Sequence, residues 1–161
     1  MLCRTSGYFS DLKFSPKGDG IAYFEHPIHW DDRGTVNYVD LQARSRVLSE
    51  GYESEEGLVW GPDGREVFYS GSLAGMDQTL FAVDLKGRRR IAFQGPGGLT
   101  IHDINREGRW LVTRDELKQG IAVLQDGVER DLSWLDGSGG GILTQAGAMV
   151  VFEEWSAAMG Q

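Results

Sequence analysis

The residue types best suited to chemistry are concentrated in one short stretch, residues 26–32 (HPIHWDD). The stretch contains two imidazoles and two carboxylates, which are groups that coordinate zinc and similar ions in proteins. Ligands three residues apart converge most readily on a helix, and Pro27 makes a helix unfavourable at this point. We therefore expect a surface loop and treat metal binding as a weak hypothesis. The candidate metal ligands are His26, His29, Asp31 and Asp32.

Acidic residues near the third histidine form a second candidate group. The dipeptides His102-Asp103 and Asp115-Glu116 supply side chains that could transfer protons in general acid–base catalysis. His102 falls in an expected strand, where a histidine is more commonly held by hydrogen bonds than free to act. We interpret it as a buried structural residue.

Serine and phosphate chemistry lack the sequence context that they require. A nucleophilic serine within Gly-x-Ser-x-Gly sits on a strand-to-helix elbow, and no expected helix follows segments 71–75 and 137–139. The glycine-rich run 137–141 also lacks the Gly-Lys-Ser/Thr ending of a phosphate loop. We expect that run to be a flexible link. The chain is therefore expected to have no catalytic residue, no enzymatic activity and no cofactor.

The overall charge argues against partners that are themselves negatively charged. The 161 residues carry a formal net charge of −8 at pH 7, and such a surface repels nucleic-acid phosphates. The basic triplet 88–90 is expected to lie exposed on a strand edge. The single cysteine, Cys3, excludes a disulfide within the chain and a thiolate metal cluster. No leader and no long apolar run are visible, so we expect a cytoplasmic protein that binds neither nucleic acid nor membrane.

The elements that would hold these residues are visible as an internal repeat. Four segments share one pattern around a turn glycine, namely 14–24 (FSPKGDGIAYF), 60–70 (WGPDGREVFYS), 104–114 (INREGRWLVTR) and 143–153 (LTQAGAMVVFE). Their glycines, Gly18, Gly64, Gly108 and Gly147, are 46, 44 and 39 residues apart. In the first two segments a proline pre-sets a turn, the glycine closes it in a left-handed conformation, and a strand follows. The period matches a four-stranded propeller blade.

A strand–turn–strand unit follows each of the first three copies. These units are 36–48 (VNYVDLQARSRVL), 79–91 (TLFAVDLKGRRRI) and 121–132 (IAVLQDGVERDL). The first two share Val-Asp-Leu, and the third carries an Asp-Gly hairpin signal instead. Each period therefore contains four strands, and no amphipathic helix is evident. The predicted fold class is all-β.

The pattern resembles the WD40-like β-propeller repeat family of the TolB type, in which an apolar residue is followed by Ser-Pro-Asp-Gly and a buried strand. Segments 14–18 (FSPKG) and 60–64 (WGPDG) match it well, whereas 105–108 and 144–147 keep the glycine and its setting. The chain is also similar to the propeller segments found behind some bacterial serine/threonine kinase domains. The resemblance covers about residues 10–153 and implies a fold, because the motif residues build turns.

The propeller expected from this resemblance is incomplete. It forms a single partial domain over residues 1–161, with blades at about 11–49, 57–93 and 99–133 and a half blade at 142–153. Closed propellers have roughly four to eight blades. Three explanations remain open: a fragment of a longer propeller, a homodimer in which two half-rings close one ring, and a degenerate small ring or another β architecture. In the homodimer, residues 2–5 of one copy would complete the last blade of the other.

Loops on the ring faces are the expected contacts, because propellers bind partners through them. They are 26–34, 50–56 and 71–78, and the acidic residues of the second loop are expected to be solvated. We predict a non-enzymatic interaction or scaffold module whose partner is a protein or peptide, above all a second copy of itself. The alternatives are a regulatory or gating segment of a kinase- or peptidase-linked enzyme whose catalytic residues lie outside this chain, and a small-ligand or sugar binder.

The five tryptophans separate into expected core and expected interface residues. Trp60, Trp110 and Trp134 lie in or beside strands and are expected to pack between blades. A tryptophan in a loop or near a terminus is instead a typical interface residue, since the indole buries a large apolar area. The candidate interface residues are Trp155, Phe152, Leu2 and Trp30.

Overall fold

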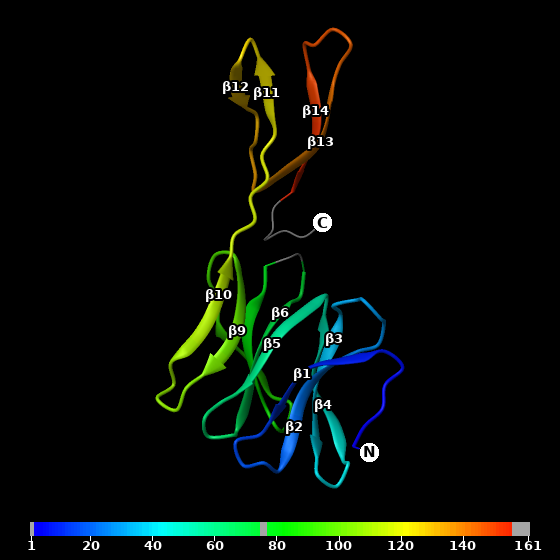
Figure 1. Ribbon diagram of the computed structural model, residues 1–161, viewed down its shortest axis with the longest axis vertical. Coiled ribbons are helices and arrows are strands. Elements are labelled where there is room, and N and C mark those ends of the chain that lie inside the picture. Colours follow the sequence, from blue (N-terminus) through cyan, green and yellow to red (C-terminus); the bar gives the residue numbers. More distant parts are fainter. Residues whose placement is uncertain (1, 75–76, 156–161) are drawn as a thin grey trace.

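The computed structural model describes residues 2–74 and 77–155, and this part of the chain contains β-strands and no helix (Figure 1). The first blade is one antiparallel sheet in chain order, built from β1 (Tyr8–Phe14), β2 (Gly20–His26), β3 (Gly34–Asp40) and β4 (Ser45–Tyr52). The second blade repeats this order with β5 (Ser54–Trp60), β6 (Glu66–Ser72), β7 (Thr79–Asp84) and β8 (Arg89–Phe93). The all-β prediction is confirmed.

The turn predicted from the repeated glycine forms in all four copies. The glycine amide donates a hydrogen bond to the carbonyl three residues earlier, at 2.9 Å for Gly18 and Gly64, 3.0 Å for Gly108 and 2.7 Å for Gly147. The four glycines have φ between +65° and +77°, a conformation in which a Cβ would be strained. The two weaker copies, which lack the proline, keep the turn through the glycine and a side-chain hydrogen bond across it, from the Arg109 amide to Asn105 and from the Met149 amide to Thr144.

The aspartate of the repeated Val-Asp-Leu fixes the turn between the third and fourth strands. Asp40 Oδ1 accepts hydrogen bonds from the backbone amides of Gln42 and Arg44, both at 2.9 Å, and Oδ2 accepts one from Arg44 Nε at 2.6 Å. Asp84 makes the equivalent contacts in the second blade. These backbone bonds hold the tight turn that a side-chain carboxylate favours.

The main core lies between the first and second blades. Phe24 of β2 meets Tyr69 of β6 edge to face, with ring centroids 6.3 Å apart, and both side chains are fully buried. Trp60 of β5 donates its indole N–H to the carbonyl of Lys13 in β1 at 3.0 Å. The strands that follow the first two glycine turns, β2 and β6, are therefore buried on both faces, as stacked blades require.

A set of buried hydroxyls stabilises the same interface. Tyr69 donates a hydrogen bond to Ser49 at 2.9 Å, and the hydroxyls of Tyr69 and Tyr52 lie 2.5 Å apart. Arg89 donates to the Tyr52 hydroxyl at 2.7 Å. The buried polar atoms of this set satisfy one another, which removes the cost of taking them out of water.

The third repeat starts as a blade and then departs from the pattern. β9 (Gly98–Ile104) packs on the second blade, where Leu99 and Ile101 join a core with Val59 and Phe68. β10 (Trp110–Asp115) pairs with β9, and within the described residues it pairs with no other strand. The sequence predicts a four-stranded blade over 99–133. The structure instead places its last two strands in a separate sheet.

The chain beyond β10 forms two hairpins that extend away from the blades (Figure 1). One joins β11 (Ala122–Gln125) to β12 (Val128–Asp131), and the other joins β13 (Gly137–Leu143) to β14 (Val150–Trp155). The glycine-rich run 137–141, expected to be a flexible link, is part of strand β13, so that expectation is wrong. Its backbone pairs with β14, and glycine makes room there for the Trp155 indole.

The N-terminal segment lies against the first blade. Tyr23 neighbours Phe24 in β2, so its side chain points to the face away from the second blade. Tyr23 and Val39 on this face are nevertheless almost inaccessible to solvent, whereas Phe14 and Val47 on the same face are exposed. Burial, and then the neighbouring Cys3 thiol, raises the pKa of the Tyr23 hydroxyl. Residues 2–5 are in no strand.

Candidate functional site

The two C-terminal hairpins are joined at their base by backbone hydrogen bonds. Gln119, in the link after β10, donates its amide to the carbonyl of Asp136 at 2.8 Å, and its carbonyl accepts from the amide of Ser138 at 2.7 Å. These bonds form one parallel bridge between the link and the start of β13. The link is therefore attached to the second hairpin instead of turning back along β10.

A single carboxylate strengthens this base. Glu154 accepts hydrogen bonds from the amides of Trp134 and Leu135, at 3.2 and 3.0 Å, and from the Ser138 hydroxyl at 2.8 Å. Desolvation acts to raise the pKa of Glu154, but these hydrogen bonds outweigh it and lower the pKa overall. The ionised carboxylate thus holds the end of one hairpin to the edge of the other.

Trp155, a predicted interface residue, lies against β13. A Cβ at Gly137 would overlap the indole, and a Cβ at Gly139 would be in tight contact with it. The side chain is half-buried, so part of the indole is already covered by its own hairpin. Leu2, another predicted interface residue, is also half-buried and lies in the N-terminal segment.

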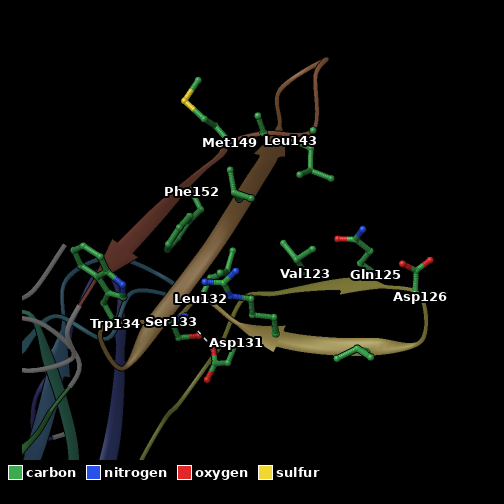
Figure 2. Close-up of a pocket in the computed structure, with 15 residues that line it drawn as sticks. Val123, Gln125, Asp126, Asp131, Leu132, Ser133, Trp134, Leu143, Met149 and Phe152 are labelled. Carbon is green, nitrogen blue, oxygen red and sulfur yellow. Dashed lines mark hydrogen bonds between the residues drawn. The ribbon is translucent and has the colours of Figure 1, made fainter.

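An open cleft of about 790 Å³ separates the hairpins above their base (Figure 2). Apolar side chains from both hairpins point toward it, and the predicted interface residue Phe152 is among them. The main apolar lining residues are Val123, Leu132, Trp134, Leu143, Met149 and Phe152. Trp134 is 88% exposed. The expectation that it packs between blades is therefore wrong, because the third blade does not close around it.

Two strands of the C-terminal half, β10 and β11, each have one unpaired edge. Every residue of β10 is exposed, including Leu111 at 63%. In the described part of the chain β11 pairs with β12 alone, and Leu124 of β11 is 74% exposed. An unpaired edge with apolar side chains is a template for pairing with another strand.

The 26–34 loop does not bring its candidate metal ligands together. His26 is buried, with Nε2 2.8 Å from Ser10 Oγ and Nδ1 3.2 Å from the carbonyl of Arg33, and it stacks on Tyr8. His29 stacks on Tyr8 from farther along the loop. In residues 2–74 and 77–155, no three His, Cys, Asp or Glu side chains are grouped to hold a metal ion.

Asp31 is occupied by a neighbouring cation. The Arg33 backbone and guanidinium both donate to its carboxylate at 2.9 Å, and these hydrogen bonds lower the pKa of Asp31 to about 2. Asp32 contributes its carbonyl to the Glu55 amide at 3.2 Å. Trp30 is 94% exposed at the loop tip, which keeps it available as the interface residue that the sequence predicts.

Two further expectations are corrected by burial. His102 is exposed and lies 2.5 Å from Thr113 Oγ1 on β10, so it is hydrogen-bonded but not buried. His102 is not buried because β11 and β12, the expected third and fourth strands of this blade, form a separate sheet. Glu55, expected in a solvated acidic loop, is instead 6% exposed in β5, and neither carboxylate oxygen has a hydrogen-bond partner.

The burial of Glu55 was not predicted from the sequence, because Glu55 lies among acidic residues that are exposed. A β-bulge lies between Glu56 and Leu58, where Gly57 has φ +64°. A bulge changes which residues face inward. The glycine at position 57 is the signal in the sequence that could have indicated this shift. Residues 75 and 76 of the predicted 71–78 contact loop lie outside the described residues.

Comparison with known proteins supports the fold alone. No family model matches the chain, and no curated protein matches it. Among solved structures, the chain is similar to TolB from Acinetobacter baumannii, with a TM-score of 0.55, 16% sequence identity and 93% of this chain covered. The likeness confirms the prediction of an unclosed, propeller-like all-β fold. The chain spans 38% of the length of that neighbour.

The structure gives no sign of a membrane-crossing helix in the residues that it describes. Among the described residues, none of the structure is a helix with the length and apolar character needed to span a bilayer.

Proposed function

We propose that this chain is a non-enzymatic β-propeller interaction module whose partner is a protein, above all a second copy of itself. The observation that supports this best is the exposed edge of β10. Blades one and two each complete four strands and bury a shared core, whereas in the third repeat β10 pairs on one side only and exposes Leu111. A surface of this kind gains stability when another strand covers it.

Exposed apolar side chains of the C-terminal hairpins enlarge the proposed contact area. Leu124 lies on β11, which pairs with β12 alone, and Trp134 and Phe152 line the cleft between the C-terminal hairpins. Large contiguous apolar surfaces are rare on isolated soluble proteins and are typical of interaction sites. Aromatic residues in such a surface carry much of the binding free energy when a partner buries them.

The molecular mass in solution tests self-association directly. Static light scattering on the purified chain over a range of concentrations should give a mass of twice 17.8 kDa. Leu111→Lys should weaken the association, because a lysine on a strand edge opposes pairing. Burying one leucine contributes about 1.5–3 kcal/mol, so the dissociation constant should rise roughly tenfold to a hundredfold.

A matched control separates the edge from general surface effects. Leu41→Lys changes a leucine in a first-blade turn that is exposed by 53%, far from β10. Its dissociation constant should equal that of the unchanged chain. A strictly monomeric mass at all concentrations would refute self-association.

A second candidate function is a regulatory or gating segment of a larger propeller-bearing enzyme. It is favoured by the coverage of 38% of the TolB chain, because a longer propeller could contain a segment such as this one. In that case β10 would pair with neighbouring sequence in the longer protein. The purified chain would then be monomeric, and adding the adjoining segment in trans would produce a stable complex.

A further inference from the structure

We propose that two copies of this chain exchange their C-terminal hairpins, so that β11 of one copy pairs with the unpaired edge of β10 in the other. The inference rests on the proposed self-association and names the strand contact that would produce it. It differs from the arrangement expected from sequence, in which residues 2–5 of one copy complete the other.

The first two blades define what belongs at the β10 edge. In each of them the third strand pairs antiparallel with the second, with Gly20 opposite Asp40 in the first blade and Glu66 opposite Asp84 in the second. Both pairs join the residue two positions after the turn glycine to the aspartate of Val-Asp-Leu. The repeat therefore predicts which residues of a third strand should face β10.

Transfer of this register to the third repeat gives a specific pairing. The equivalent positions are Trp110 and Gln125, which set Leu111 opposite Leu124 and Val112 opposite Val123. Leu111 and Leu124 are 63% and 74% exposed in the structure. The equivalent pair in the second blade, Val67 opposite Val83, is fully buried. Pairing of β10 with a β11 strand would therefore cover both leucines.

The chain's own hairpin is directed away from this edge. After β10 the link continues outward instead of turning back, and Gln119 is bonded to Asp136 and Ser138 at the base of the second hairpin (Figure 1). Glu154 ties the two hairpins together there. Extended connections that carry an intact element away from its own sheet favour domain swapping, in which a second copy receives the element. The register of the repeat and the direction of the link both favour β11 of a second copy as the strand that pairs with the free edge of β10.

The N-terminal segment supplies no strand for exchange. The face of the first blade that points away from the second is buried around Tyr23, with Cys3 beside it, although Phe14 and Val47 on that face are exposed. Residues 2–5 lie outside any strand and are on this face, so they are not extended toward another molecule as an edge strand. The exposed edges of the third repeat are thus the better-placed elements for exchange.

Two singly substituted chains test the exchange, because a disulfide between them cannot form within one chain. Val112→Cys and Val123→Cys are made separately, each together with Cys3→Ser, and the two chains are unfolded and refolded as a mixture. Opposite residues of an antiparallel pair have Cβ atoms about 4.5–5.5 Å apart, within reach of a disulfide after small adjustments. Mild oxidation should shift the band on a non-reducing gel from one chain to two.

A second pair and a register control complete the design. Leu111→Cys with Leu124→Cys tests the neighbouring pair, because adjacent pairs alternate between wide and narrow spacing and one of them is closer. Leu111→Cys mixed with Val123→Cys is out of register and places the thiols on opposite faces, so it should not link. Light scattering on each reduced mixture measures whether the chains still associate.

The outcomes distinguish the exchange from self-association itself. Linked heterodimers at an in-register pair, without links in the control, support the exchange. A dimeric mass with no link at either in-register pair overturns the exchange and leaves self-association standing. A monomeric mass, with a disulfide that forms only when Val112→Cys and Val123→Cys are placed in the same chain, overturns both. It would show that β11 folds back on its own β10.

Discussion

Glu55 provides a quantitative test of the packing between the first two blades. Its carboxylate is buried, both oxygens lack hydrogen-bond partners, and desolvation raises its pKa from 4.5 to about 8. Gly34 makes this position possible, because a Cβ at Gly34 would lie 2.7 Å from Glu55 Oε2 and 3.0 Å from His26 Nδ1. The folded protein therefore holds Glu55 protonated at neutral pH.

The raised pKa has a definite sign for stability. The unfolded chain releases the Glu55 proton above about pH 4.5, whereas the folded chain keeps it until about pH 8. The folded state binds more protons between these values, so the free energy of unfolding falls as pH rises through this window. One pKa unit corresponds to about 1.4 kcal/mol, which gives a loss of up to about 3 kcal/mol at pH 7.

Glu55→Gln should remove this loss, because the amide has a similar shape and does not ionise. Urea unfolding followed by tryptophan fluorescence at pH 5, 6, 7 and 8 would give the free energy of unfolding by linear extrapolation. The variant should resemble the unchanged protein at pH 5. It should be more stable than the unchanged protein at pH 8 by about 2–4 kcal/mol, because the amide has no pH-dependent loss of this kind.

The control is a glutamate in the same acidic stretch that is exposed. Glu50→Gln changes the same net charge but should leave the pH dependence of stability unaltered. Parallel stability–pH curves for the unchanged protein and Glu55→Gln would refute the reasoning. They would mean that Glu55 reaches solvent or a cation in the folded state.

Other predictions concern the hydroxyl set and the C-terminal hairpins. Tyr69→Phe should lower the free energy of unfolding by about 1–2 kcal/mol in urea titrations, because it removes the hydrogen bonds that the buried Tyr69 hydroxyl makes with Ser49 and Tyr52. Trp30→Ala, at an exposed loop tip, should change it by less than about 0.5 kcal/mol, and a larger change would place Trp30 in a packed site. Gly137→Ala should displace the Trp155 indole, cost about 1–3 kcal/mol and red-shift the tryptophan emission, and an unchanged spectrum would contradict the overlap.

The elements that local chemistry determines could be predicted from sequence. The turn at Gly18 needs a residue that tolerates positive φ, and the turn after Asp40 needs a carboxylate that accepts backbone amides, so both leave a repeated signature. The strands beside them are apolar because both faces are covered. The all-β class and the unclosed propeller follow from counting these signatures.

The features that depend on distant contacts could not be predicted in the same way. β11 has the sequence of a third strand, but its partner is decided by the link at Gln119 and not by its own residues. Strand pairing depends on tertiary context more than on propensity. The exposure of Trp134 and His102 follows from that one difference in pairing. Glu55 was expected to be solvated but is buried, because the bulge at Gly57 changes which side chains of β5 face inward.

The position of both exchange elements in one half of the chain limits how far assembly could proceed. Head-to-tail association of identical units continues into a filament when each unit keeps one free donor and one free acceptor end. Here the donor hairpin and the acceptor edge both lie in the C-terminal half of the chain. A reciprocal exchange uses both at once and leaves neither a donor hairpin nor an acceptor β10 edge free. Such an assembly would be self-limiting at two chains, so this protein should remain a discrete particle at concentrations where an open strand stack would polymerise.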